Sequence, residues 1–178
     1  MAESLDISGG GLFQIAEPEA GAPKRRRKVG KAIGIDLGTT HSLVAIAPKG
    51  AAPRVLIDDE GEALLPSVVS YAETGPDGGE VVVGRAARAQ AVEHPEQVLV
   101  SVKRFMGRGP GDIDFHHPYR LADDAQVVRI DVAGPGESQP RWVSPVEVSA
   151  RILEVLEQLA FDEIGEVAGA VITVPAYF

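Results

Sequence analysis

The chain has 178 residues, of which 44% are hydrophobic and 24% are charged, and its formal net charge is −9. This composition is typical of a soluble globular domain with enough apolar side chains for a core. The absence of cysteine excludes disulfides and thiolate chemistry, and no apolar run approaches the roughly 20 residues that cross a bilayer. We therefore expect a cytoplasmic protein that does not bind membranes.

Residues 1–31 are predicted to be a flexible N-terminal extension, because they are rich in glycine and proline and end in a basic run. Six of the 17 basic residues fall within positions 24–31. The run is similar to a nuclear import signal, but a solvated arm ahead of the first strand is the favoured interpretation, since such runs recur by composition alone. The rest of the chain is acidic, which argues against broad nucleic-acid binding.

The segment that follows predicts two short strands joined by a turn. The first strand ends on Asp36. Gly38 has no Cβ, so the turn amides can approach an anion closely and form a nest. Thr39 and Thr40 add hydroxyl donors, and Asp36 is placed to hold a hydrated Mg²⁺ near phosphates. These residues are typical of a nucleotide site.

An ordinary hairpin explains the same turn equally well, because Asp and Gly are common turn residues. The segment is not a Walker A loop, since no Gly-Lys-Ser/Thr opens a helix, and it is not Gly-x-Gly-x-x-Gly. P-loop and Rossmann sites are therefore excluded.

Further strands are predicted where apolar segments are divided by turn residues, at residues 54–57, 67–71 and 81–83. Residues 85–92 predict a short helix, and residues 98–106 favour a second one that Gly107 stops. Residues 107–140 are expected to form an irregular loop with a weak strand at 127–132.

A long helix is predicted from Ser144, which suits the N-cap position, with Pro145 at N1 and Glu147 completing a capping box. Gly165 is a natural stop. The expected buried stripe consists of Val148, Ile152, Val155 and Leu159, with Leu156 beside it.

Residues 168–174 form an apolar run that suits a strand covered on both faces. Pro175 ends it, because proline cannot donate to a sheet ladder. The chain stops soon afterwards, at Phe178, so we expect an incomplete domain.

In this order the segments resemble the nucleotide-binding domain of the DnaK-type (heat-shock-70) molecular chaperones, from about residue 32 to the last residue. The matching segments are residues 34–40, 65–69, 83–87, 102–107 and 171–178, which read GIDLGTT, LPSVV, VGRAA, VKRFMG and VITVPAYF. The first is shared across the actin-like superfamily, and the last is close to diagnostic for the chaperones.

Within that family the chain is most similar to the HscA branch, which serves iron–sulfur cluster assembly, at residues 12–18, 64–69 and 101–108. The resemblance implies an α/β, actin-like or ribonuclease H-like ATPase domain, of which residues 32–178 would be an incomplete first lobe. The second phosphate loop, the adenosine pocket, a catalytic threonine and the client-binding domain would lie beyond Phe178.

The resemblance makes Asp36, Gly38, Thr39 and Thr40 the first phosphate loop, which contacts the phosphates of ATP and, through water, Mg²⁺. It makes Lys103 the catalytic lysine that orients the attacking water and stabilises charge on the γ-phosphoryl group. Without the resemblance, a surface lysine would be the preferred interpretation of Lys103.

Pro175 matches a proline that relays nucleotide state to the client-binding domain, although it also suits a plain strand end. His41 stands where the family usually carries asparagine, so the loop gains a titratable ring and we expect a modest change in nucleotide affinity. His116 and His117 are interpreted as part of a solvated loop rather than a metal site.

The implied function is an ATP-driven chaperone that acts with a J-domain co-chaperone on an iron–sulfur scaffold protein or another unfolded client. Two alternatives share the Asp-x-Gly-Thr-Thr turn: a small-molecule kinase of the same superfamily and a bacterial actin-like filament protein. Neither is expected to carry both residues 102–107 and residues 171–178. The 178 residues alone are not expected to hydrolyse ATP, since half of the phosphate clamp would be absent.

Overall fold

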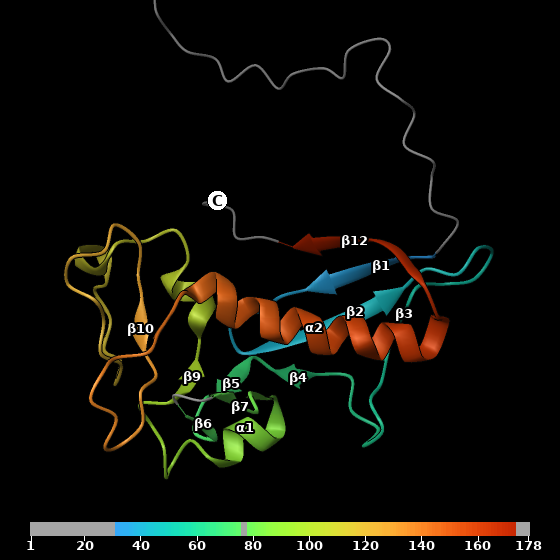
Figure 1. Cartoon of the computed structure of the whole chain (residues 1–178). Helices are drawn as coiled ribbons and strands as arrows, with labels where there is room; N and C mark the ends of the chain where they lie inside the picture. The colour runs from blue at the N-terminus through green and yellow to red at the C-terminus, as the bar shows by residue number, and fades with distance from the viewer. Residues whose placement is uncertain (1–30, 76–77, 174–178) are drawn as a thin grey trace, which may run out of the picture.

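The computed structural model describes residues 31–75 and 78–173. Its main sheet has the order β12-β1-β2-β3, and β4 pairs with β2 (Figure 1). β1 and β2 are antiparallel, whereas β12 lies parallel to β1. The strands span Lys31–Asp36 (β1), His41–Ile46 (β2), Arg54–Val55 (β3), Leu65–Pro66 (β4) and Val167–Thr173 (β12).

A smaller antiparallel sheet, in the order β8-β5-β9, lies beside the main one and packs against α1. Two further strand pairs, β6–β7 and β10–β11, are formed by the connecting segments. The strands of these sheets are Val68–Ser70 (β5), Thr74–Gly75 (β6), Gly78–Gly79 (β7), Val82–Val83 (β8), Val98–Val100 (β9), Ile130–Asp131 (β10) and Trp142–Val143 (β11). The short helices are Arg85–Ala89 (α1) and the 3-10 turns Val102–Phe105 (η1) and Pro110–Asp112 (η2).

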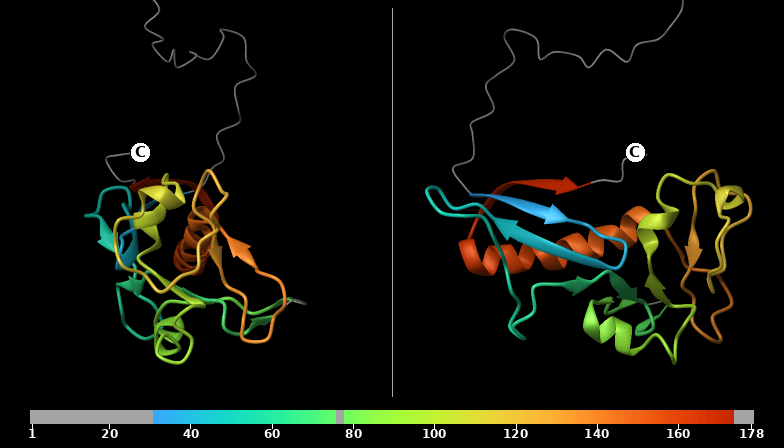
Figure 2. Two further views of the ribbon diagram at one scale, coloured as in Figure 1. Left: turned by 90° about the vertical axis from the view of Figure 1, so that its left-hand side faces the viewer. Right: turned by 180° about the vertical axis from the view of Figure 1, so that it is seen from behind.

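The long helix α2 (Pro145–Ile164) runs along one face of the main sheet and reaches the smaller one, as the two views of Figure 2 show. Its predicted start is confirmed: Ser144 Oγ accepts a hydrogen bond of 3.2 Å from the Glu147 amide, and the Glu147 carboxylate accepts one of 2.6 Å from the Ser144 amide. Gly165, with φ 74°, ends the helix as predicted.

The buried stripe of α2 differs from the expected one. The buried apolar residues form a row four apart: Val148, Ile152, Leu156 and Ala160. Val155 is 38% exposed and Leu159 is half-buried. The i±4 row is one of the ridges along which helices pack, and here it forms the most deeply buried part of the helix face, while the half-buried Leu153, Leu159 and Ile164 pack against the same core.

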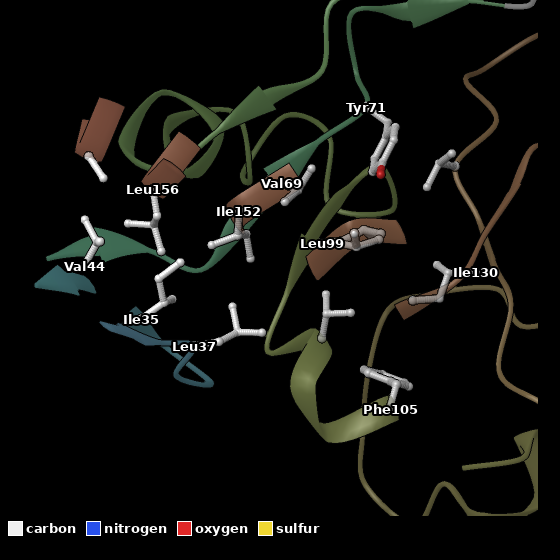
Figure 3. Packing of buried hydrophobic residues seen from close by; sticks show 14 of the residues in the cluster. Ile35, Leu37, Val44, Val69, Tyr71, Leu99, Phe105, Ile130, Ile152 and Leu156 are labelled. Atoms are coloured by element: carbon white, nitrogen blue, oxygen red, sulfur yellow. The ribbon is translucent and has the colours of Figure 1, made fainter. Parts of the chain in front are cut away.

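One continuous core joins the two sheets, α2 and the loop that contains β10 (Figure 3). Ile35, Leu37 and Val44 contribute from the β1–β2 hairpin, and Ile152 and Leu156 from α2. The smaller sheet and the loops add Val69, Tyr71, Leu99, Phe105 and Ile130. This shared core fixes η1 relative to the β1–β2 hairpin.

Two further sequence predictions are wrong. Residues 98–106 form β9 and then η1 instead of one helix, because β9 pairs with β5 and Ser101 takes a left-handed conformation, with φ 55°, between them. In the described chain β12 is an edge strand, with Val171 73% exposed, and it is not covered on both faces. Among the described helices, none is both long and apolar enough to span a membrane.

Candidate functional site

The turn between β1 and β2 is closed so tightly that it requires glycine at position 38. A Cβ placed on Gly38 would lie 2.1 Å from the carbonyl oxygen of His41, far inside any permitted contact. The hairpin pairs Asp36 with Leu43 as its last register position. The closure of the turn itself therefore requires glycine at this position, and a residue without a Cβ is also what a backbone cradle for an anion uses.

A buried serine pair holds the turn from the protein side. Ser67 donates from its hydroxyl to the Gly38 carbonyl, at 2.9 Å, and from its amide to the Thr40 carbonyl, also at 2.9 Å. Because the Ser67 proton is used in this way, the Ser42 hydroxyl, 2.9 Å away, must donate to Ser67 Oγ. Two carbonyl oxygens of the turn are thus neutralised by donors from the protein interior, which reduces their repulsion of an anion.

Asp36 ends β1 at the edge where β12 also ends. The two strands are parallel, and their register pairs Asp36 with Thr173. The Thr173 hydroxyl donates to one carboxylate oxygen of Asp36 at 2.6 Å, and the Asp36 side chain is exposed. This bond orients the carboxylate while its second oxygen keeps its lone pairs for another ligand.

Lys103 is brought to the same edge from a distant part of the chain. Its ammonium donates to the carbonyl oxygen of Leu37, the residue directly after Asp36. η1 positions it, since Val102 and Phe105 on either side of Lys103 are buried. A positive charge therefore stands beside the turn, at the backbone of the residue that follows Asp36.

An aromatic cluster packs against η1 through Phe105. The ring of Phe105 lies 4.9 Å from that of Phe115, 5.4 Å from that of His117 and 5.9 Å from that of Tyr119, centroid to centroid. The Tyr119 hydroxyl accepts a hydrogen bond of 2.8 Å from the Val100 amide, and burial raises the pKa of Tyr119. The cluster ties η1 to β9, so the position of Lys103 depends on tertiary packing.

A cavity of about 240 Å³ opens beside the turn. It is lined by Thr39, Thr40, Ser67, Arg88, Ser101 and neighbouring apolar groups. Its hydroxyls and guanidinium are groups that bind anions, which agrees with the character of the turn.

The structure brings together five residues that the sequence singled out: Asp36, Gly38, Thr39, Thr40 and Lys103. Pro175 lies outside the described residues. His41 begins β2 and is half-buried.

Three contributors were missed by the sequence analysis: Ser67, Ser101 and Thr173. For Thr173 a signal existed, because parallel strands that end in Asp and Thr place both at one edge. Ser67 and Ser101 lie in segments that carry the family resemblance, residues 65–69 and 101–108, but nothing in those segments indicated a contact with the turn.

Within residues 31–75 and 78–173 no three His, Cys, Asp or Glu side chains are grouped as they would be to hold a metal ion.

Comparison with known proteins is decisive for the family. The family described as "Hsp70 protein" matches residues 32–178. The chain belongs to the Hsp70 family. Its similarity to three proteins named "Chaperone protein HscA homolog" places this Hsp70 chain in the HscA branch. The chain is 51% identical to the protein from Bordetella petrii, 50% identical to the one from Burkholderia multivorans and 49% identical to the one from Methylococcus capsulatus.

Each of these alignments covers 94% of this chain and 25% of the relative. The Hsp70 chain thus spans about a quarter of the length of the curated relatives it matches. The resemblance read from residues 34–40 and 171–178 is confirmed by these matches.

Proposed function

We propose that this chain supplies one wall of the ATP site of an HscA-type Hsp70 chaperone, with the actin-like ATPase fold that the family implies. The proposal rests on one observation: Asp36, the turn at Gly38 and Lys103 lie together at the end of β1. Lys103 reaches this place from 66 positions away, where its ammonium contacts the carbonyl of Leu37.

The residues fit Mg·ATP by their chemistry. The turn amides and the hydroxyls of Thr39 and Thr40 would bind phosphate oxygens, and Asp36 would hold Mg²⁺ through water. When bound, ATP would supply the phosphoryl group, and Mg²⁺ would neutralise part of the negative charge on the phosphates. Lys103 would orient the attacking water and stabilise charge on the γ-phosphoryl group, which suits a reaction that depends on positioning and electrostatics.

The HscA relatives, which are named as chaperones, support the wider role. We propose an ATP-dependent cytoplasmic chaperone that acts with a J-domain co-chaperone on an iron–sulfur scaffold protein, with Pro175 relaying nucleotide state. The 178 residues alone should bind Mg·ATP weakly and should not hydrolyse it. Submicromolar binding of Mg·ATP to these residues in calorimetry would contradict this part of the proposal.

The test of the site is Lys103→Ala in the intact protein. Turnover of ATP should fall by about 10² to 10³, the usual loss when a charge-stabilising group is removed, while the Kd for Mg·ATP in calorimetry changes little. Lys49→Ala, which removes an exposed lysine from another turn, is the matched control and should keep full turnover. Equal turnover in the Lys103 and Lys49 variants would refute the catalytic role.

A further inference from the structure

An acidic groove runs between α2 and the loop that joins β3 to β4, away from the phosphate turn. Its volume is about 300 Å³. Its apolar floor is formed by Leu65, Val155, Leu156 and Leu159, and its rim by Asp58, Asp59, Glu62 and Asp162. The four carboxylates make the rim negative, while the floor leaves apolar surface uncovered, including Val155.

The loop that forms one side of this groove is well ordered. Asp58 accepts hydrogen bonds from the amides of Glu60 and Glu62, at 3.0 and 2.9 Å, and forms an ion pair with Arg85 of α1. Arg85 also pairs with Glu60, at 2.6 Å. The groove is therefore a preformed feature, held between α1 and α2.

Most of the rim charge is not compensated. Within the described residues, no ion pair neutralises Asp59, Glu62 or Asp162. Asp162 accepts only a neutral hydrogen bond, of 2.7 Å, from Gln158. The groove thus has the character of a site for a basic segment whose long side chains can lay their apolar stems on the floor.

The chain itself carries a basic segment, residues 24–28, and this segment precedes β1, which begins near the end of α2 that borders the groove. Lys31 and Ile164 line one cavity, so the start of β1 lies against the C-terminal end of α2. The loop between β3 and β4 lies below the same end of α2 in both Figure 1 and Figure 2. Residues 24–30 can span roughly 23 Å when extended, whereas Ile164 and Leu159 are about 8 Å apart along the helix axis.

We propose that the basic run of residues 24–29 docks in this groove of its own chain, with its guanidinium and ammonium groups on the acidic rim. Residues 24–28 are Lys, Arg, Arg, Arg and Lys, followed by Val29. Individual exposed ion pairs are weak, but the short tether keeps the run at a high effective concentration near the groove. This docking does not depend on nucleotide and so stands apart from the proposed function.

A spin-label experiment on the intact protein tests this. The 178 residues contain no cysteine, so a nitroxide can be placed at one position once any cysteine elsewhere is replaced. Leu64→Cys puts the label on an exposed side chain next to the groove without altering its lining, and Ala47→Cys puts it beside the start of β1. We expect the amide signals of residues 24–26 to be reduced more strongly with the label at position 64 than with the label at position 47.

Charge variants make the result specific. Asp59→Lys with Glu62→Lys should restore the reduced signals, and adding Arg25→Glu, Arg26→Glu and Arg27→Glu should reduce them again. Retained signals with the label at position 64, or stronger loss with the label at position 47, would overturn the proposal, since an undocked arm stays nearer its point of entry. Signal loss in isotope-labelled chains mixed with spin-labelled, unenriched chains would show docking on a second copy and would overturn it as well.

Discussion

The hydroxyl of Thr173 donates a hydrogen bond of 2.6 Å to the carboxylate of Asp36, across the edge where β12 and β1 end side by side. Residues 137 positions apart in sequence are thereby joined at the centre of the candidate site. The orientation of the carboxylate proposed to hold Mg²⁺ consequently depends on correct docking of the last described strand.

Thr173→Val removes this hydrogen bond while keeping the branched shape of the side chain. In the intact protein the affinity for Mg·ATP should fall about fivefold, equivalent to about 1 kcal/mol for one hydrogen bond. Calorimetry measures the change. Thr173→Ser keeps the hydroxyl and should bind as the wild type does; equal weakening by both substitutions would mean that the hydrogen bond is not the cause.

Gly38→Ala should destabilise the β1–β2 hairpin, because the new methyl group would meet the His41 carbonyl at 2.1 Å and the backbone must move. A loss of about 2 kcal/mol or more in the free energy of unfolding is expected, measured by urea denaturation. Gly34→Ala is the control in the same hairpin, since its methyl group would come no closer than 4.0 Å to Ala45. A similar loss in both variants would point to strand propensity instead of the clash.

Ser67→Ala should cost about 1 to 3 kcal/mol of stability, because it strips the Gly38 carbonyl of its hydroxyl donor and leaves the buried Ser42 hydroxyl without its acceptor. Denaturant unfolding of the single and double variants checks this. Adding Ser42→Ala should recover part of the loss, since it deletes the unsatisfied hydroxyl. Strict additivity of the two substitutions would contradict the coupled network.

The start of α2 should make stability depend on pH. The hydrogen bond that the Ser144 amide donates to the Glu147 carboxylate holds the pKa of Glu147 below its usual range. A carboxyl whose pKa is lowered by folding contributes stability above its unfolded pKa, and this contribution is lost as the pH falls through the folded pKa. Glu147→Gln should therefore have a lower Tm than the wild type at pH 7, and the difference should shrink as the pH falls below about 4.5.

Glu157→Gln is the control for this effect, because it removes an exposed carboxylate from the middle of the same helix. A Tm difference between the wild type and Glu147→Gln that stays constant from pH 7 to pH 3 would show that the charge at the helix start is not responsible.

Local chemistry made some of these features predictable. The capping residues Ser144 and Glu147 and the stop at Gly165 were read correctly because each acts within a few residues of its own position. The β1–β2 turn was also recognisable from adjacent residues, although its role in phosphate binding rested on the family resemblance. The presence of Lys103 beside it depends on packing through Phe105 and Tyr119.

The remaining features could not be predicted because they depend on contacts between residues that are distant in the sequence. The short apolar run at residues 98–100 suits a helix segment as well as a strand, and β5 supplies the partner that makes it β9. The left-handed Ser101, which redirects the chain into η1, is not marked by glycine. The wrong assignment of Val155 to the buried stripe has the same origin, since the face that α2 buries is set by the two sheets it crosses.

The exposed side of β12 has a practical consequence. Among the described strands, β12 has β1 as its single sheet partner, and its second edge offers backbone groups flanked by Val171 and Ile172. An apolar edge of this kind is a template for strand addition. Preparations limited to these 178 residues should therefore self-associate as concentration rises, whereas any partner segment that extends the sheet at β12 would keep them monodisperse.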